Sequence, residues 1–414
     1  MAKKHLIIGS GIAALSAVRA IRRITQDDEV KAITTENCLP YSPAVLPYLI
    51  SKKTNEENIS IADKEFFRET GCTFENAREV TQIKPERKEV IYKDGGFEQY
   101  DRLLIATGSY PLRPTIKGIQ QKDALCCHTL ADCRDIMKRL GKKSKVILYG
   151  AGLVALELAA ALLETGHSVA IVVRSRILRR YFDEESAGII SRIFKEHGAD
   201  IRQGAEITGA RREGTTIVVS LSDGTTLEGD VLVCCLGVNP NVDFLGGSGV
   251  EVNDGVVVDQ YMRTNIEDIY AAGDVAESTD FFNGERGVNA IAPSAISQGR
   301  VAGSNMAGLR MEHPGWIAMN VFKFLKHTAF SVGIFEGEGL HSIKEKGEKY
   351  FKELAFKDDR LVGVRFIDID IDPGVFRYLI ETSTEVKQKA LLLERPQETS
   401  LSLMMLAEKG VQPR

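Results

Sequence analysis

Residues 5–14 read His-Leu-Ile-Ile-Gly-Ser-Gly-Ile-Ala-Ala, and residues 145–155 read Lys-Val-Ile-Leu-Tyr-Gly-Ala-Gly-Leu-Val-Ala. Each stretch is a short apolar strand, then Gly-x-Gly-x-x-Ala, then a helical segment rich in Ala and Leu. Another apolar run follows each helix, at Val30–Thr35 and at Val169–Val173. This strand–helix–strand pattern occurs twice, in units of about 30 residues, and predicts an α/β chain with two Rossmann-like dinucleotide-binding domains.

The first glycine pattern has the residue types that a dinucleotide pyrophosphate requires. Gly9 permits the tight turn from strand to helix, Gly11 lets the backbone approach the pyrophosphate, and Ala14 keeps the helix close to the strand. The phosphates then meet unpaired N–H groups at the positive end of the helix. Glu36 follows the second strand, where an acid accepts hydrogen bonds from the adenosine ribose.

Two later stretches place the chain near a known family. Residues 101–109 read Asp-Arg-Leu-Leu-Ile-Ala-Thr-Gly-Ser, and residues 270–274 read Tyr-Ala-Ala-Gly-Asp. They resemble the second and third FAD motifs of the pyridine nucleotide-disulfide oxidoreductases. Leu236–Asn241 is also similar to the element that returns that family's chain from its NAD(P) domain. The resemblance implies that FAD binds in the first domain and that Thr107, Gly108 and Asp274 contact it.

The second glycine pattern then serves a nicotinamide nucleotide, NAD(H) or NADP(H). Gly150, Gly152 and Ala155 repeat the roles of Gly9, Gly11 and Ala14. The resemblance further implies that Glu157, on the same helix, lies near the nicotinamide.

The end of the next strand leaves the choice of coenzyme open. Val173 stands where NAD enzymes carry an acid, and Arg174, Arg176 and Arg179 follow. Arginine binds a 2′-phosphate through charge-assisted, bidentate hydrogen bonds, which favours NADP slightly. Solvated loop charges explain the same residues, and family members with a similar Val-Val-Arg-Ser stretch work with NAD.

Redox-active cysteines of the expected kind are missing from the sequence. Disulfide reductases of the family use paired cysteines beside the flavin, because a thiolate must attack it and then reduce a disulfide. Family members with one active cysteine carry it before a Leu-Pro-Tyr-like stretch, where this chain has Ala44. We therefore expect Pro43, Ala44 and Val45 to line the flavin face, with Cys38 as the only alternative thiol nearby in sequence.

The bulk composition excludes several other classes of protein. A net charge of −4 without basic runs gives no footprint for nucleic acid. No apolar stretch is long enough for a membrane span. The seven scattered cysteines form no disulfide framework. The apolar N-terminal run superficially resembles a signal peptide, but Gly9 and Gly11 interrupt it. A cytoplasmic location is therefore the default expectation. The seven histidines show no spacing typical of a metal site.

The order of these segments predicts three domains. The FAD-binding domain is expected to comprise residues 1–115 and 240–310, with the NAD(P)-binding domain inserted at 116–239. Residues 311–414 are expected to form an α+β interface domain, with alternating segments such as Leu361–Ile371 and a final amphipathic helix. Its aromatic residues supply either core or apolar contacts to a second copy or a partner; they include Trp316, Phe322, Phe324 and Phe330.

Three functional hypotheses follow. The first is a thiol-independent, FAD-dependent NAD(P)H oxidoreductase that exchanges hydride between nicotinamide and FAD. Its electrons would pass to or from iron–sulfur or ferredoxin-like subunits, a small acceptor or oxygen. With Leu-Pro-Tyr-Ser-Pro at 39–43 in place of the active cysteine and a short C-terminal domain, the chain resembles the NADH:acceptor flavin subunits of phenylglyoxylate dehydrogenase-type complexes. This resemblance favours NAD, against the argument from the arginines. The alternatives are a disulfide reductase that uses Cys38 and a flavin-dependent interaction or assembly subunit.

Overall fold

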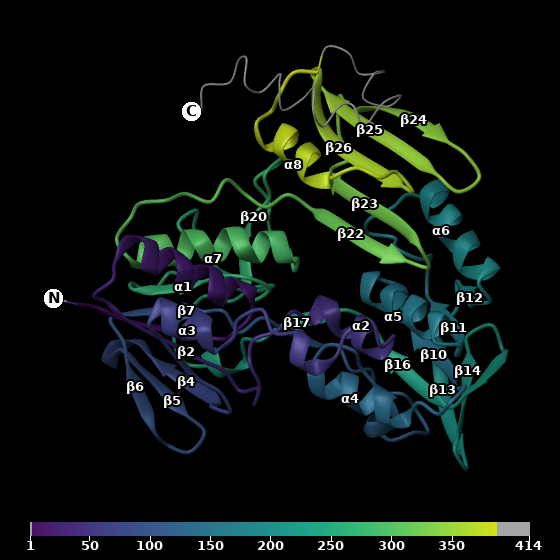
Figure 1. Ribbon diagram of the computed structural model, residues 1–414, viewed down its shortest axis with the longest axis horizontal. Coiled ribbons are helices and arrows are strands. Elements are labelled where there is room, and N and C mark those ends of the chain that lie inside the picture. Colours follow the sequence, from purple (N-terminus) through teal and green to yellow (C-terminus); the bar gives the residue numbers. More distant parts are fainter. Residues whose placement is uncertain (1, 387–414) are drawn as a thin grey trace. The chain divides into compact units, whose positions relative to one another are not determined.

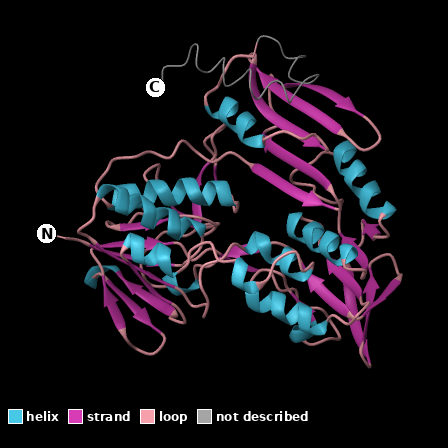
Figure 2. Cartoon of the chain, in the orientation of Figure 1, coloured by secondary structure: helices cyan, strands magenta, loops and turns pink. Residues whose placement is uncertain are grey.

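The computed structural model describes residues 2–386, and contacts between Cα atoms divide the chain into two compact units (Figures 1 and 2). Among the described residues, the first unit consists of residues 2–45, Thr54–Pro111 and Val238–Ile317. The second unit consists of Leu46–Lys53, Leu112–Gly237 and residues 318–386. The last part of the predicted interface domain, residues 387–414, lies outside the described residues.

The first unit is built on a five-stranded parallel sheet. In spatial order its strands are β19 (Ile269–Ala271), β7 (Arg102–Ile105), β1 (Lys4–Ile8), β2 (Glu29–Ile33) and β3 (Cys72–Glu75). The central strand β1 is apolar at consecutive positions because both faces of a parallel sheet are covered. Ile8 is in register with both Ile33 and Ile105, so the carboxyl ends of three neighbouring strands end together.

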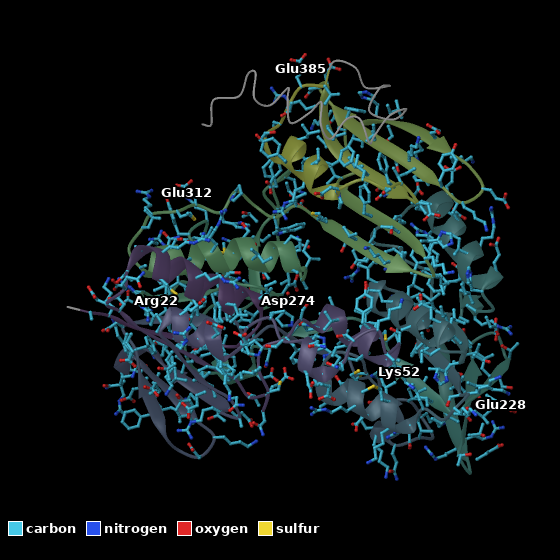
Figure 3. All side chains as sticks on the ribbon, in the orientation of Figure 1. Arg22, Lys52, Glu228, Asp274, Glu312 and Glu385 are labelled. Atoms are coloured by element: carbon cyan, nitrogen blue, oxygen red, sulfur yellow. The ribbon has the colours of Figure 1, made fainter. Side chains whose placement is uncertain are left out.

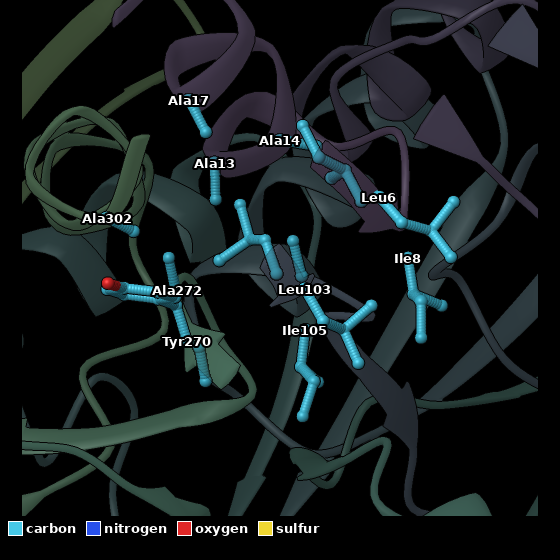
Figure 4. Packing of buried hydrophobic residues seen from close by; sticks show 14 of the residues in the cluster. Leu6, Ile8, Ala13, Ala14, Ala17, Leu103, Ile105, Tyr270, Ala272 and Ala302 are labelled. Carbon is cyan, nitrogen blue, oxygen red and sulfur yellow. The ribbon is translucent and has the colours of Figure 1, made fainter. Parts of the chain in front are cut away.

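Two helices of the first unit, α1 (Ile12–Ile24) and α7 (Ala292–Met306), pack very closely, and small residues allow the approach (Figure 4). A Cβ added at Gly299 would lie 2.2 Å from the carbonyl oxygen of Ala13. One added at Gly303 would lie 2.4 Å from that of Ala17. Larger residues at these positions would push the helices apart and move the start of α1.

Smaller sheets complete the first unit. An antiparallel sheet contains β4 (Val80–Lys84), β5 (Glu89–Tyr92) and β6 (Phe97–Gln99), and α3 (Lys64–Thr70) precedes β3. The other strands are β18 (Val256–Val257), β20 (Ala276–Thr279), β21 (Arg286–Gly287), and the antiparallel pair β8 (Ser109–Pro111) and β17 (Val238–Pro240).

The second unit contains another five-stranded parallel sheet. In spatial order its strands are β12 (Asp200–Gln203), β11 (Ser168–Val173), β10 (Lys145–Tyr149), β16 (Val231–Cys234) and β9 (Ala124–Leu125). Its helices are α2 (Leu46–Ile50), α4 (Leu130–Arg139), α5 (Leu153–Glu164) and α6 (Glu184–Glu196). A separate antiparallel sheet contains β13 (Ile207–Glu213), β14 (Thr216–Leu221) and β15 (Thr226–Gly229).

The second unit ends in an antiparallel sheet with one helix, α8 (Pro373–Glu381). Its strands, in spatial order, are β22 (Met319–Phe324), β23 (His327–Gly333), β26 (Arg360–Ile367), β25 (Phe351–Lys357) and β24 (His341–Lys346). Phe322, Phe324 and Phe330 are buried, and the ring of Phe324 stacks on Phe194 of α6 with centroids 5.3 Å apart. The sequence left open whether these aromatic residues form a core or contact a second copy or a partner, and the structure places these three in the core.

A buried ion pair also ties this antiparallel sheet to the start of α6. Arg365 donates to the carboxylate of Glu353 at 2.7 Å, and both side chains are almost completely buried. Its guanidinium also lies 3.2 Å from the carboxylate of Asp183, the N-cap of α6.

The predicted fold class is confirmed: the chain is α/β, with two Rossmann-like parallel sheets and a C-terminal α+β part. Within residues 2–386, no helix combines the length and the apolar character that crossing a membrane requires.

Candidate functional site

In the first unit, the neighbouring strand requires a glycine at the turn from strand to helix. Gly9 has φ +122°, and a Cβ added there would lie 2.0 Å from the carbonyl oxygen of Ala106, which follows β7. The backbone is fixed on both sides, because Gly9 donates to Ile33 at 2.8 Å and Ala106 donates to Ile8 at 2.8 Å. Only glycine fits this position without moving the sheet.

Gly11 is not required by the protein's own packing. It is the N-cap of α1 with φ −69°, and a Cβ added there would meet no atom within 4 Å. No side chain caps the helix, and its first turn carries no acid. The positive end of α1 thus carries neither a capping side chain nor an acid, which suits a pyrophosphate. Ala14, fully buried, packs the helix onto the sheet.

The Ala-Thr-Gly turn lies beside this glycine turn and is linked to the returning chain. Ala106, the residue that Gly9 approaches, immediately precedes Thr107. The hydroxyl of Thr107 donates to the carbonyl of Asn241 at 2.8 Å, and the Asn241 amide donates to the carbonyl of Gly108 at 2.9 Å. Gly108 has φ +66°, in the left-handed region that glycine adopts most easily.

Asp274 also lies at this carboxyl edge, three residues after the end of β19 (Figure 3). The Ser109 hydroxyl donates to one of its carboxylate oxygens at 3.3 Å. A hydrogen bond fixes the turn before Asp274, because the Gly273 amide donates to the buried side chain of Gln298 at 2.8 Å. Three motifs that are far apart in sequence are thus brought to one end of the parallel sheet, where α/β proteins bind nucleotides.

Glu36 and the turn Pro43–Val45 lie further along the first unit. Glu36 is exposed after β2, and its carboxylate accepts a hydrogen bond from Tyr41 at 2.8 Å. Pro43–Val45 forms a short 3-10 turn on which Pro43 and Ala44 are exposed. Contact of these residues with FAD remains a prediction.

None of the seven cysteines, all of which lie in the described part of the chain, forms a disulfide. Five are buried and two, Cys38 and Cys235, are half-buried. Burial raises the pKa of Cys72 to about 11 and that of Cys234 to about 12. Burial also raises the pKa of the Cys126, Cys127 and Cys235 thiols. Protonated, buried thiols are poor nucleophiles.

The glycine turn of the second unit repeats the first in detail. Gly150 has φ +114°, and an added Cβ would lie 2.2 Å from the carbonyl oxygen of Cys235, after β16. Gly152 is the N-cap of α5, without a side-chain cap, and an added Cβ would meet nothing within 4 Å. Ala155 is fully buried. This helix start is also without a side-chain cap, which suits a pyrophosphate.

Glu157 follows on the first turns of α5 and is largely enclosed. Burial raises the pKa of its carboxyl to about 7. Its charge acts on Tyr48 of α2, whose pKa is raised mainly by burial and then by Glu157. A carboxyl that titrates near neutral pH beside a nucleotide turn is a typical feature of functional sites.

Arg174 lies directly after β11, where the sequence places the adenosine ribose. Its side chain is 75% exposed, and its Nε lies 3.6 Å from the carboxylate of Glu206. Arg176 differs, because its guanidinium donates to the backbone carbonyls of Ile177, Asp183 and Arg179. The structure therefore distinguishes the exposed Arg174 from Arg176, which hydrogen-bonds the backbone, although the sequence gave no reason to treat them differently.

Sequence reasoning missed the residues that support the motifs. Ser109 and Gln298 give no periodic or spacing signal, because each acts through a contact that is distant in sequence. The spacing of Gly299 and Gly303, which equals that of Ala13 and Ala17, was a usable signal for the close contact between α1 and α7. Among residues 2–386, no group of three or more His, Cys, Asp or Glu side chains is arranged to hold a metal ion.

Comparison with known proteins gives matches along most of the chain. Residues 3–299 match the family described as pyridine nucleotide-disulphide oxidoreductase. A curated relative is the NADH-dependent phenylglyoxylate dehydrogenase subunit epsilon of Aromatoleum evansii. It is 34% identical over 390 residues, which cover 92% of this chain and 92% of the relative.

Solved structures agree on the fold. The covalent putidaredoxin reductase–putidaredoxin complex contains a chain with a TM-score of 0.88 and 21% identity, covering 97% of this chain and 98% of that one. An engineered water-forming NADPH oxidase bound to NADPH has a TM-score of 0.86 and 22% identity, covering 97% of this chain and all of that one.

The predicted family and cofactors are thereby confirmed. At both glycine turns, the position of an added Cβ at the helix start is unobstructed by the protein. With FAD and a nicotinamide nucleotide as its cofactors, the chain is an NAD(P)H-dependent oxidoreductase and belongs to the pyridine nucleotide-disulphide oxidoreductase family.

Proposed function

We propose that this chain takes electrons from NAD(P)H and passes them to an iron–sulfur protein or subunit, without a redox-active cysteine. The observation that carries the proposal is the placement of the thiols. The turn Pro43–Val45, which by family resemblance faces the flavin, carries none, and five of the seven cysteines are buried. FAD, when bound, supplies the hydride and single-electron chemistry that the side chains lack.

The residues of the chain have binding and positioning roles in this proposal. The uncapped starts of α1 and α5 hold the two pyrophosphates through Gly11 and Gly152. Thr107, Gly108 and Asp274 hold FAD at the carboxyl edge of the first sheet. Glu36 binds the adenosine ribose of FAD.

Glu157 has a separate role in this proposal, on the nicotinamide side. Its carboxyl, enclosed on α5, titrates near neutral pH. It holds or releases a proton beside the nicotinamide ring.

An iron–sulfur acceptor is supported by the kinds of protein that this chain resembles. The relative from Aromatoleum evansii is named as a subunit of a dehydrogenase. The putidaredoxin reductase was solved in a covalent complex with putidaredoxin. We propose a corresponding partner here, with the chain acting as the electron-transfer subunit of a 2-oxoacid dehydrogenase-type complex.

The names of the relatives differ on the coenzyme, and one spacing pattern bears on it. The engineered NADPH oxidase is a mutant of the Lactobacillus brevis NADH oxidase with five substitutions. The first is Gly→Ala. Eighteen positions later come three consecutive substitutions, Asp→Ala, Ala→Arg and Met→Ser, and Pro→Arg follows five positions after the last of these. This chain has the corresponding types at the same spacing, namely Ala155, Val173, Arg174, Ser175 and Arg180. The agreement supports NADPH.

The proposed function is tested by anaerobic mixing of the FAD-loaded protein with NADH or NADPH. We expect prompt bleaching of the flavin absorbance, then reduction of an added ferredoxin but not of an added disulfide. Cys38→Ser should leave these rates unchanged. Loss of turnover in Cys38→Ser would show a disulfide reductase, and failure of both nucleotides to bleach the flavin would show a binding or assembly role.

A further inference from the structure

We propose that Arg365, on β26 of the C-terminal antiparallel sheet, is a positioning residue for the nicotinamide nucleotide. It anchors the turn after β11, and that turn fixes the direction of the backbone at Gly152, where the pyrophosphate binds in the proposed function. Arg365 itself does not contact the nucleotide. The inference rests on the proposed function, because it takes the start of α5 as the place that holds the nucleotide.

The turn after β11 comprises residues 174–183 and is bonded directly to the glycine turn of the same unit. The Leu178 amide donates to the carbonyl of Ala151, between Gly150 and Gly152, at 2.9 Å. The peptide group that joins Ala151 to Gly152 is planar and trans, so its carbonyl and its N–H point in opposite directions. The bond from Leu178 therefore sets the direction of the Gly152 N–H, which points away from the turn.

Leu178 makes this bond in an unusual backbone conformation. Its φ is +50°, in the left-handed region that is unfavourable for leucine. Its carbonyl accepts from the Tyr181 amide at 2.9 Å and from the Phe182 amide at 3.1 Å, and its side chain is almost completely buried. A residue keeps a strained conformation only where its surroundings enforce it, so the position of Leu178 depends on Tyr181 and Phe182.

Arg365 holds this end of the turn. Its Nε donates to the carbonyl of Tyr181 at 3.1 Å. Its Nη1 lies 3.2 Å from the carboxylate of Asp183 and 2.7 Å from that of Glu353. The guanidinium carbon lies 3.8 Å from the centroid of the Phe335 ring, and the whole side chain is almost completely buried. The sheet thus fixes the guanidinium, and the Tyr181 carbonyl has a rigid donor.

A role in stability alone needs less than this arrangement provides. The pairing of Arg365 with Glu353 uses Nη1 and is complete without Nε. The Nε bond reaches the backbone of the turn at Tyr181 instead, and Arg176 closes the same turn from within by donating to the Asp183 carbonyl at 3.3 Å. Loss of the Nε bond should therefore release the turn even where the sheet stays folded.

Two variants remove the Nε bond and are expected to leave the sheet folded. Arg365→Lys keeps a cation beside Glu353 and Asp183, but its ammonium cannot occupy the positions of both Nε and Nη1. Arg365→Met combined with Glu353→Leu replaces the buried pair by apolar side chains of similar size, which proteins often tolerate. The control is Phe366→Leu, which weakens the same strand from its other face, where the ring packs against Phe376 of α8 with centroids 5.4 Å apart.

The measurements separate nucleotide binding from folding. Binding of NAD⁺ and NADP⁺ to the FAD-loaded protein is measured by calorimetry, and hydrogen exchange is followed on the peptide that contains residues 176–183. Loss of one anchoring hydrogen bond corresponds to roughly 3- to 10-fold in affinity. Both Arg365 variants should weaken the two nucleotides by the same factor, because the pyrophosphate is common to them, and should speed exchange in this peptide. KM should rise for NADH and NADPH alike with kcat unchanged. Phe366→Leu should lower the melting temperature and change none of these values.

The proposal is overturned if either Arg365 variant binds both nucleotides as tightly as the wild type, a result that leaves the proposed function intact. A loss confined to one nucleotide also refutes it, since the effect would then not act at the pyrophosphate. An equal loss in Phe366→Leu refutes it as well, because general loosening of the sheet would explain the result. A wild-type protein that binds neither nucleotide removes both the inference and the proposed function.

Discussion

Alanine at Gly9 and alanine at Gly11 are expected to damage the protein in different ways. At Gly9 the backbone has φ +122°, and the new Cβ would lie 2.0 Å from the Ala106 carbonyl oxygen. At Gly11 φ is −69°, and the new Cβ would meet nothing within 4 Å. The same methyl group therefore tests the packing of the sheet at one position and the space before α1 at the other.

The expected magnitudes differ because the two sites differ in strain. A strained backbone conformation costs roughly 1–3 kcal/mol, and overpacking costs about the same again. Gly9→Ala should thus lower the free energy of unfolding by about 2–6 kcal/mol, a large share of the roughly 5–15 kcal/mol that proteins have. Gly11→Ala should change it by no more than about 1 kcal/mol, because alanine restricts the unfolded chain but is a poorer N-cap than glycine.

The assay separates folding from cofactor binding. Thermal unfolding is followed on FAD-free protein, and retained FAD is measured from the visible flavin absorbance of the purified protein. Gly9→Ala should melt early, whereas Gly11→Ala should melt like the wild type but lose FAD. Gly150→Ala and Gly152→Ala should repeat the contrast for the nicotinamide nucleotide, since an added Cβ meets Cys235 at 2.2 Å in the first and nothing in the second.

Two outcomes would refute this reasoning. If FAD-free Gly11→Ala melts as early as Gly9→Ala, the space before α1 is not open. If Gly11→Ala retains FAD as the wild type does, the pyrophosphate does not lie there.

Three further predictions concern stability. Gly299→Ala should lower the melting temperature, because its Cβ would lie 2.2 Å from a carbonyl oxygen of α1. The control is Gly188→Ala on α6, whose Cβ would meet no atom within 4 Å and which should raise the free energy of unfolding by about 1 kcal/mol. Equal effects of the two variants would contradict this prediction. Because burial raises the pKa of Glu157 to about 7 from 4.5, its contribution to stability is fully present below pH 4.5 and is lost as pH rises to about 7. Glu157→Gln should therefore raise the free energy of unfolding by about 1–3 kcal/mol near pH 8 but not near pH 4, and a constant difference in denaturant titrations would disprove it. Arg365→Ala leaves the buried Glu353 carboxylate with Lys344, 3.3 Å away, as its remaining cation, and should lower the free energy of unfolding by up to about 3–5 kcal/mol. Arg365→Met combined with Glu353→Leu should cost less, and an additive loss in the double variant would exclude the ion pair as the cause.

The sequence by itself determined the features that depend on neighbouring residues. Gly9 and Gly150 mark strand-to-helix turns because the backbone there admits little else, and Gly11 and Gly152 mark the helix starts that follow them. Apolar runs such as Val169–Val173 are strands because a parallel sheet buries both faces. The fold class and the two kinds of cofactor followed from these turns, their order and the family resemblance.

Only the tertiary structure decided how side chains that are distant in sequence meet. It set Ser109 against Asp274, and it buried Phe324 within the second unit. It also drew Arg176 onto backbone carbonyls and left Arg174 exposed, although the two are two residues apart in one loop. Such differences arise from long-range packing, which sets the exposure and the partner of each group, and spacing along the chain does not encode them.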